Sequence, residues 1–135
     1  MGKYTGLQAD VFSILDSAEW KATNIKTHPA NFLAIDAGTE FIRVDILATG
    51  SGINFNSVSG LILIDIFTPA GVGPKRPAEI ADILDTFFVG KQLKTASGAV
   101  TQLLRSSFAS KGNDKDNPNL FRSAYAIPFN YFGVQ

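Results

Sequence analysis

Residues 61–67, LILIDIF, constrain the fold of this 135-residue chain more than any other segment. In an extended strand these side chains are apolar on both faces, with the single exception of Asp65. A strand with two apolar faces lies in the middle of a sheet. A carboxylate there needs a partner, because an unpaired buried charge is costly. We expect Asp65 to pair with Arg43, Arg105 or Arg122, each on a predicted strand; an edge position or a contact with a partner protein is the alternative.

The strand is followed by a turn rich in glycine and proline and then by a helix, in residues 67–84, FTPAGVGPKRPAEIADIL. Strand, glycine-rich loop and helix is also the layout of many phosphate-binding loops. A P-loop requires Lys followed by Ser or Thr, whereas Gly73 is followed here by Pro-Lys-Arg-Pro, and Arg76 breaks the dinucleotide fingerprint. Pro74 and Pro77 each remove a backbone N–H that an anion would use. The turn is therefore predicted to be a corner and not a nucleotide site.

Hydrophobic periodicity predicts the other elements of the first two thirds of the chain. Residues 6–18 are expected to form an amphipathic helix, which Thr5 and Gln8 would open as a capping box. The alternating segment EFIRVDILATG predicts a half-buried strand, and a short strand is expected before it at residues 32–36. A second helix is predicted over residues 77–89, with a proline at its first position and an apolar stripe facing the core, and Gly90 is expected to end it.

The last third of the chain predicts a long hairpin over residues 100–132. Its two strands flank a polar loop tip, KGNDKDNPN, at residues 111–119. On the second strand, aromatic and apolar side chains of residues 121–131 share one face, and Pro128 belongs at an edge or a bulge. Together these elements predict one α+β domain spanning residues 1–135, with a mixed, largely antiparallel sheet of four or five strands and two helices packed on it.

The sequence offers little chemistry for an active site. It has no Cys, which excludes disulfides, thiolate catalysis and zinc–sulfur sites. Its one histidine, His28, has no local signature of a nucleophile or of metal ligands. The segment NDKDN resembles a calcium loop only faintly, since Asn119 and Tyr125 replace the Gly and Glu of that motif. We therefore predict a protein that is not an enzyme and that holds no cofactor and no metal.

Charge and hydropathy disfavour further classes of protein. The net charge is zero and the pI is about 6.5, which argues against a dedicated nucleic-acid binder. The N-terminus lacks the apolar stretch of a signal peptide, and no segment approaches the length that spans a membrane, so a cytoplasmic protein is expected. Charged residues make up 18% of the chain. This is less than in an average globular domain, and it fits a surface that is partly covered by neighbours.

The order of the elements is more informative than any single motif. An N-terminal helix precedes FIRVDIL, then SGLILIDIFTPAGVGPKRPAEIADILDTFF, and then a hairpin that ends in an aromatic strand. This pattern resembles the tail terminator proteins of long-tailed bacteriophages. The similarity is greatest from Gly60 to Phe88 and extends more loosely over nearly the whole chain. It implies a small α/β subunit that forms a hexameric ring on the head-proximal end of the tail tube, stops tube polymerisation and offers a surface to the neck.

The resemblance implies partners but no catalytic residues. The expected partners are further copies of the chain in a homohexamer, the tail tube protein and a neck or head-completion protein. DNA would pass through the lumen without sequence-specific binding, and no membrane would be involved. The protein would be located in the virion, at the tail and neck, after assembly in the host cytoplasm. The hairpin 100–132 and the turn 69–77 are the expected contact surfaces, and the exposed charges most relevant to them are Lys75, Arg76, Asp114, Lys115 and Asp116.

Three other interpretations are compatible with the same residues. Another neck or head-completion protein, or a tail tube subunit, would also self-associate, but a tube subunit would polymerise indefinitely. A small-molecule enzyme would use His28 with Asp36 or Glu40. A ligand-binding domain would use the aromatic face of residues 121–131, although the alternation of that face fits burial in the core better.

Overall fold

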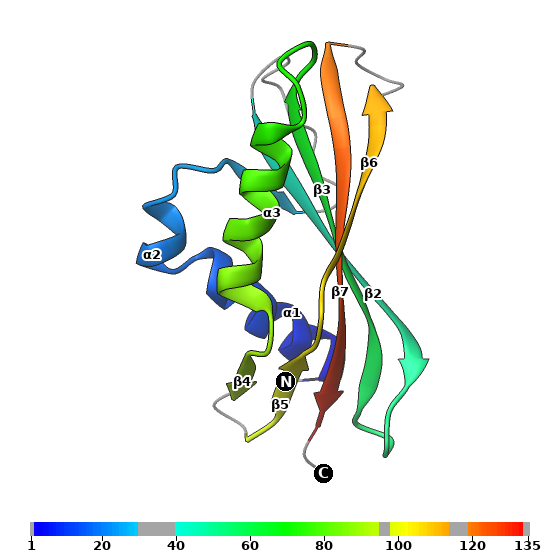
Figure 1. Cartoon of the computed structure of the whole chain (residues 1–135). Coiled ribbons are helices and arrows are strands. Elements are labelled where there is room, and N and C mark those ends of the chain that lie inside the picture. Colours follow the sequence, from blue (N-terminus) through cyan, green and yellow to red (C-terminus); the bar gives the residue numbers. More distant parts are fainter. Residues whose placement is uncertain (1, 30–39, 95–97, 114–118, 134–135) are drawn as a thin grey trace.

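The computed structural model describes residues 2–29, 40–94, 98–113 and 119–133, which form three helices and a seven-stranded sheet (Figure 1). The helices are α1 (Lys3–Leu15), α2 (Ala18–Lys21) and α3 (Lys75–Phe88). The strands are β1 (Thr27–Pro29), β2 (Phe41–Ser51), β3 (Val58–Pro69), β4 (Gln92–Lys94), β5 (Val100–Leu103), β6 (Ser107–Asn113) and β7 (Leu120–Phe132). The expected strand at residues 32–36 lies outside the described residues.

The sheet is mixed and largely antiparallel, as predicted. Its strand order is β1-β2-β3-β7-β5-β4, and β6 also pairs with β7. Among the described strands, β1 runs parallel to β2 and the other pairs are antiparallel. The α+β fold class is therefore confirmed. The sheet has more strands than the expected four or five, because the short strands β1 and β4 extend its edges and the first strand of the predicted hairpin is divided into β5 and β6.

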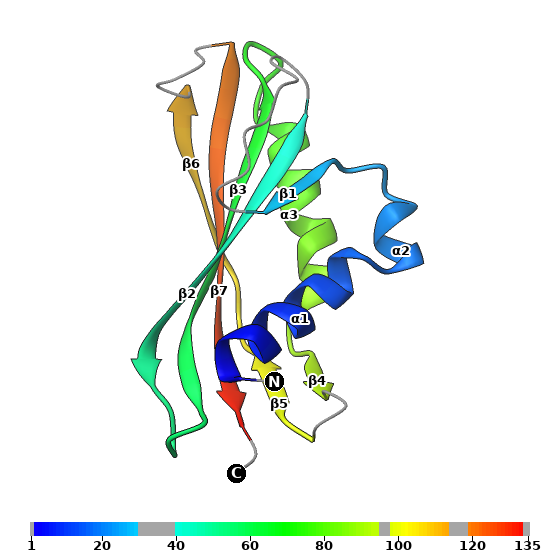
Figure 2. The same cartoon turned by 180° about the vertical axis from the view of Figure 1, so that it is seen from behind.

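Strand β3 lies in the middle of the sheet, between β2 and β7. One of its faces packs in the hydrophobic core, and the other carries a charged pair. Figures 1 and 2 show that the sheet is strongly twisted and that all three helices lie on one side of it. Ile62, Ile64 and Ile66 are fully buried in the core that the helices share. Asp65 faces the opposite side and pairs there with Arg122 of β7, whose Nη2 lies 3.0 Å from Oδ1 of Asp65. Arg122 is one of the three partners that the sequence suggested for this carboxylate.

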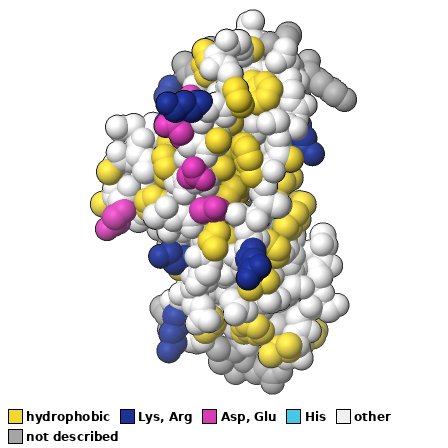
Figure 3. Space-filling model, in the orientation of Figure 1, with side chains coloured by type: hydrophobic (Ala, Val, Ile, Leu, Met, Phe, Trp, Pro, Cys, Tyr) yellow, Lys and Arg dark blue, Asp and Glu magenta, His cyan; other side chains and the backbone are white. Residues whose placement is uncertain are grey.

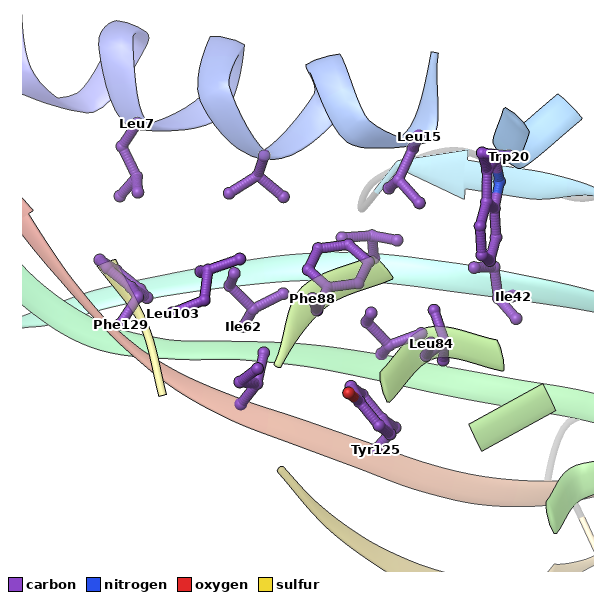
Figure 4. Packing of buried hydrophobic residues seen from close by; sticks show 14 of the residues in the cluster. Leu7, Leu15, Trp20, Ile42, Ile62, Leu84, Phe88, Leu103, Tyr125 and Phe129 are labelled. Atoms are coloured by element: carbon purple, nitrogen blue, oxygen red, sulfur yellow. The ribbon is translucent and has the colours of Figure 1, made fainter. Parts of the chain in front are cut away.

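The hydrophobic core fills the space between the helices and the sheet. In Figure 4 the apolar side chains of α1 point toward those of α3 and of the strands below them. Leu84 and Phe88, in the predicted stripe of α3, are fully buried, and the burial of such a side chain contributes about 1.5–3 kcal/mol. Trp20 of α2 closes the core against Phe87, with ring centroids 5.2 Å apart. The Trp20 Nε1–H donates to Thr27 Oγ1 at 2.9 Å, so this large side chain also satisfies its polar atom.

Helix α1 begins earlier than predicted, and the predicted capping box at Thr5 and Gln8 is wrong. Gly2 is the N-cap residue and makes no side-chain capping hydrogen bond, while Thr5 lies inside the first turn. Gly6 lies close to β7, since an added β-carbon would lie 2.5 Å from the hydroxyl oxygen of Tyr131. A glycine permits this close approach of α1 to the sheet.

The other helix ends also differ from the prediction by a few residues. α1 ends at Leu15, and Ser17 caps the short α2. α3 begins at Lys75, so that Pro77 lies inside its first turn and not at its first position. This is still tolerated, because the first four N–H groups of a helix have no partner within it. Gly90 has φ +71° and follows the end of α3, as the sequence indicated.

Pro128 explains why the strand beside β7 is divided. Residues 104–106 separate β5 from β6, and both strands pair with the same side of β7. The N–H of Leu104 donates to the Pro128 carbonyl at 3.0 Å. In an antiparallel strand the N–H and C=O of one residue point to the same neighbour, so the donor that Pro128 lacks faces this break. The predicted irregularity is therefore present, although β7 is not an edge strand.

Asp85 of α3 holds the break between β5 and β6 in place. Its Oδ1 accepts hydrogen bonds from Ser106, at 2.5 Å, and from Tyr125 of β7, at 2.7 Å. The Tyr125 side chain is fully buried. Burial and the bond to Asp85 raise the pKa of the Tyr125 phenol well above its usual range, so the phenol remains a donor at every physiological pH. One carboxylate thus connects the helix to the break and to β7.

We expect Asp85→Ala to lower the free energy of unfolding by roughly 1–3 kcal/mol, because it leaves the buried Tyr125 hydroxyl without an acceptor. The double variant Asp85→Ala/Tyr125→Phe should cost less than the sum of Asp85→Ala and Tyr125→Phe. Urea denaturation of the three variants measures this coupling. Additive losses would mean that the two groups contribute independently to stability.

Candidate subunit interface

The two contact surfaces predicted from sequence meet at one end of the molecule. The turn between β3 and α3 lies beside the start of β7, and the Ala70 N–H donates to the Asn119 carbonyl at 2.8 Å. Figure 1 shows this turn at the top of the view, next to the ends of β6 and β7. We call residues 69–76 together with Asn119 the turn end, and Lys75 is exposed there. Three predicted contact residues lie outside the described part of the chain: Asp114, Lys115 and Asp116.

Arg76, also predicted to be a contact residue, is engaged within the subunit. Its Nε lies 2.5 Å from Oε1 of Glu40, and its Nη2 lies 2.9 Å from Oε2. This two-bond geometry is the strongest that an arginine and a carboxylate form, and it raises the pKa of Arg76. The two side chains are 37% and 26% exposed, so solvent screening limits the contribution of the pair. Arg76 thus fixes the turn to the start of β2, and Lys75 is the more accessible of the two cations.

The outer face of α3 is charged. Figure 3 shows acidic side chains in a row over this helix, below basic side chains at its N-terminal end. Glu79 and Asp82, three residues apart, are both exposed on it. Residues at this spacing lie on the same face of a helix. The row is a solvated surface that any docking partner of α3 would have to match with positive charge.

The opposite end of the molecule presents exposed hydrophobic side chains. The turn that joins β2 to β3, residues 52–56, carries Ile53 and Phe55, which are 79% and 86% exposed. Lys3 of α1 lies beside them: its Nζ donates to the Phe55 carbonyl at 3.1 Å and lies 5.5 Å from the centroid of the Phe55 ring. We call residues 52–56 the tip. Two large apolar side chains exposed to water within one five-residue turn are unusual, and such exposure indicates a contact surface.

The tip is held in a defined conformation. The side-chain carbonyl of Asn54 accepts hydrogen bonds from the Asn56 N–H, at 2.9 Å, and from the Ser57 hydroxyl, at 3.0 Å. Asn side chains commonly stabilise turns in this way. From sequence the segment GSGINFNSVSG is a turn-rich link, and it was not among the predicted contacts. The signal that points to it is a pair of large apolar residues, Ile53 and Phe55, among polar turn residues.

The sheet face opposite the helices is only partly covered by its own side chains. A second, small cluster of buried residues, Phe41, Phe67 and Leu120, lies on it. The rings of Phe41 and Phe67 are stacked, with centroids 4.6 Å apart, and the guanidinium of Arg43 lies 5.2 Å from the Phe67 centroid. None of the described helices covers this face, as Figures 1 and 2 show. We call it the helix-free face.

The helix-free face also contains a hollow of about 350 Å³. Ala124 and Ala126 lie on β7, which runs between β3 and β6 at this position. The alanines are small, so the longer side chains of the two flanking strands rise above them. The other residues that line the hollow are Leu63, Asp65, Ser107, Phe108, Ala109, Lys111 and Arg122. A mostly apolar depression with two cations at its rim is suited to an aromatic side chain.

The residues of the alternative enzyme hypothesis do not form a visible catalytic site. His28 lies on β1 against Phe41, with ring centroids 5.4 Å apart, and Glu40 is bound to Arg76. Asp36 lies outside the described residues. Within the described ranges, no group of three or more His, Asp or Glu side chains is placed to hold a metal ion. Nor does any helix in these ranges have the length and apolar character needed to cross a membrane.

A buried carboxylate lies between α1 and the sheet. Asp10 is 7% exposed, and its Oδ2 accepts a hydrogen bond from Thr101 Oγ1 at 2.6 Å. Burial raises the pKa of Asp10, and the bond from Thr101 partly opposes this. The pKa of nearby Tyr131 is also raised, mainly by burial and to a smaller extent by the negative charge of Asp10. Perturbed groups often mark functional sites, but this one is enclosed under α1 and connects it to β5.

Comparisons with known proteins show the fold. Seven solved chains match this one. One, known only by a sequence identifier, is 14% identical with a TM-score of 0.72, over 98% of this chain and 97% of its own. Another is a chain from the virion of a native gene transfer agent particle, which is 18% identical with a TM-score of 0.65, over 96% of this chain and 97% of its own. No family model and no curated protein matches the chain.

We expect Asp10→Asn to change how stability depends on pH. A carboxyl whose folded pKa is raised binds its proton more tightly when folded, so its contribution to stability is largest at low pH and is lost as pH rises from the unfolded value of 3.8 through the folded pKa. Asn cannot titrate and does not lose this contribution. Relative to the parent chain, Asp10→Asn should therefore gain stability between about pH 4 and pH 7.

Urea denaturation at several pH values measures this change. Asp16→Asn is the matched control for the removal of one carboxylate, because the Asp16 side chain is 81% exposed and its ion pair with Lys21 lies on the surface. Equal pH dependence of Asp10→Asn and the parent chain would show that Asp10 ionises in the folded protein as it does in the unfolded one.

Proposed function

We propose that this chain is a structural subunit of a phage-like particle. It would assemble into a ring on the head-proximal end of a tail tube, and the resemblance to tail terminator proteins implies that the ring is a hexamer. The ring would stop tube polymerisation and provide the surface to which the neck attaches. Its partners would be other copies of the chain, the tail tube protein and a neck or head-completion protein, with DNA passing through the lumen. The observation that carries the proposal is the nearly full-length fold match to a chain of a gene transfer agent virion.

The surface of the chain supports a role in assembly. β6 pairs with β7 on one side, while its other edge is unpaired among the described strands over seven residues. An open strand edge and exposed large apolar side chains are features that monomeric proteins usually avoid. A ring subunit, in contrast, needs two different contact surfaces that meet on neighbouring copies. The tip and the helix-free face are two such surfaces on one chain.

Electron microscopy of the purified protein, alone and mixed with tail tubes of the particle to which it belongs, tests this function. We expect single rings that cap one end of each tube, even if the free protein is monomeric. Long tubes growing from the protein alone would identify a tube subunit instead. Protein that never associates with tubes or with itself would contradict the assembly role.

We also expect Lys75→Glu to reduce the fraction of capped tubes, because it reverses an exposed charge at the turn end, where the sequence predicts a contact. The matched control is Lys94→Glu, since Lys94 is also exposed but lies on β4, at the other end of the molecule in Figure 1. Each change should alter stability by less than about 0.5 kcal/mol. Equal capping by both variants and the parent chain would show that the turn end does not contact the tube or a neighbour.

A further inference from the structure

We infer that Phe55 of one copy inserts into the hollow on the helix-free face of the next copy, and that this contact joins neighbouring subunits of the ring. The inference rests on the proposed function, because it names the residues that make the self-association. It commits to one occupant of the hollow, a second copy of this chain. Three features of the chain support it: the exposure of the Phe55 side chain, the shape of the hollow and the distance between the two.

Phe55 is presented for insertion. Its side chain is 86% exposed, the largest exposed fraction among the large hydrophobic side chains described. The side-chain carbonyl of Asn54 accepts bonds from the Asn56 N–H and the Ser57 hydroxyl and so fixes the turn beneath Phe55. Little conformational freedom would therefore be lost on docking. Ile53, 79% exposed, stands beside it and would lie against the rim. A rigid turn with an aromatic side chain at its apex is the geometry of an anchor residue.

The hollow has the size and the chemistry to receive a phenyl ring. An apolar cavity of about 150 Å³ is sufficient to hold benzene, and the hollow measures about 350 Å³. Ala124 and Ala126 line it with methyl groups, and Leu63 adds an apolar side chain. Lys111 lies among the lining residues, where its ammonium can approach the face of an inserted ring. Arg122 is occupied by Asp65, so no unpaired carboxylate is buried by docking.

The tip cannot reach the hollow of its own chain. From Val58, where β3 leaves the tip, to Leu63 and Asp65 the strand runs five to seven residues, a distance on the order of 17–23 Å along the sheet. Figure 1 shows the tip at the lower end and the paired part of β6 and β7 in the upper half. An anchor and a receptor at different places on one surface make a heterologous contact, which closes into a ring when its rotation is a simple fraction of a turn.

Cysteine crosslinking tests the contact directly, because the chain has no Cys of its own. In Phe55→Cys/Ala126→Cys each copy carries both new thiols, and the contact brings the one at position 55 beside the one at position 126 of the next copy. A bismaleimide forms one thioether with each thiol and needs no oxidant. We expect a ladder of covalent oligomers on a denaturing gel, for protein at high concentration or on tail tubes. The matched control is Lys94→Cys/Ala126→Cys, since Lys94 is exposed but lies on β4, outside the predicted contact surfaces. It should remain monomeric on the gel.

Two further measurements complete the test. Phe55→Ser should fold like the parent chain, because the side chain is exposed, and should lose the rings or caps seen by electron microscopy. The absence of a ladder in Phe55→Cys/Ala126→Cys, while that protein still forms rings or caps, would overturn this contact and leave the proposed function standing. A ladder without capping would support the contact and contradict the capping role. No ladder and no assembly under any condition would contradict both.

Discussion

The need to cover both faces of β3 determines how the rest of the chain is arranged. Ile62, Ile64 and Ile66 require an apolar cover on one side, and α1 and α3 supply it. On the other side the cover is made from the sheet itself, by the small Phe41 cluster and by the pair of Asp65 with Arg122. This second cover is incomplete, because the adjacent positions on β7 are alanines. The hollow therefore lies where none of the described helices covers the second face of this central strand.

The interruption at residues 104–106 shows how a local defect can be stabilised by tertiary contacts. Pro128 removes the donor that a continuous neighbouring strand would need. Residues 104–106 therefore form no strand beside β7, and strand pairing with β7 resumes in β6. Asp85 then supplies the acceptor for Ser106 and Tyr125 at this point. β6 then continues as a strand whose outer edge is unpaired among the described strands, and this edge is a surface that a partner can use.

The features that were predictable from sequence are those set by local periodicity. The two faces of β3, the buried stripe of α3 and the stop at Gly90 all follow from spacing along the chain. The start of α1 did not: the helix begins at Lys3, because a capping motif contributes only about 1 kcal/mol and packing of the helix on the sheet can outweigh it. Of the predicted contact residues, Arg76 has an internal partner that the sequence could not show. The tip was missed because its importance depends on exposure, and periodicity does not report exposure in a turn.

The two ends of the subunit differ in chemistry, and this bears on whether a ring would stack. A tube subunit must present complementary surfaces above and below, so that each ring binds the next one. Here the turn end carries Lys75 and the pair of Arg76 with Glu40, whereas the tip is apolar. A charged end gains nothing from an apolar one, since its ions would lose water without gaining partners. If the tip is also occupied by a neighbour within the ring, neither end offers a surface that another copy can use. This difference between the two ends fits the proposed single ring on a different protein better than a continuous stack.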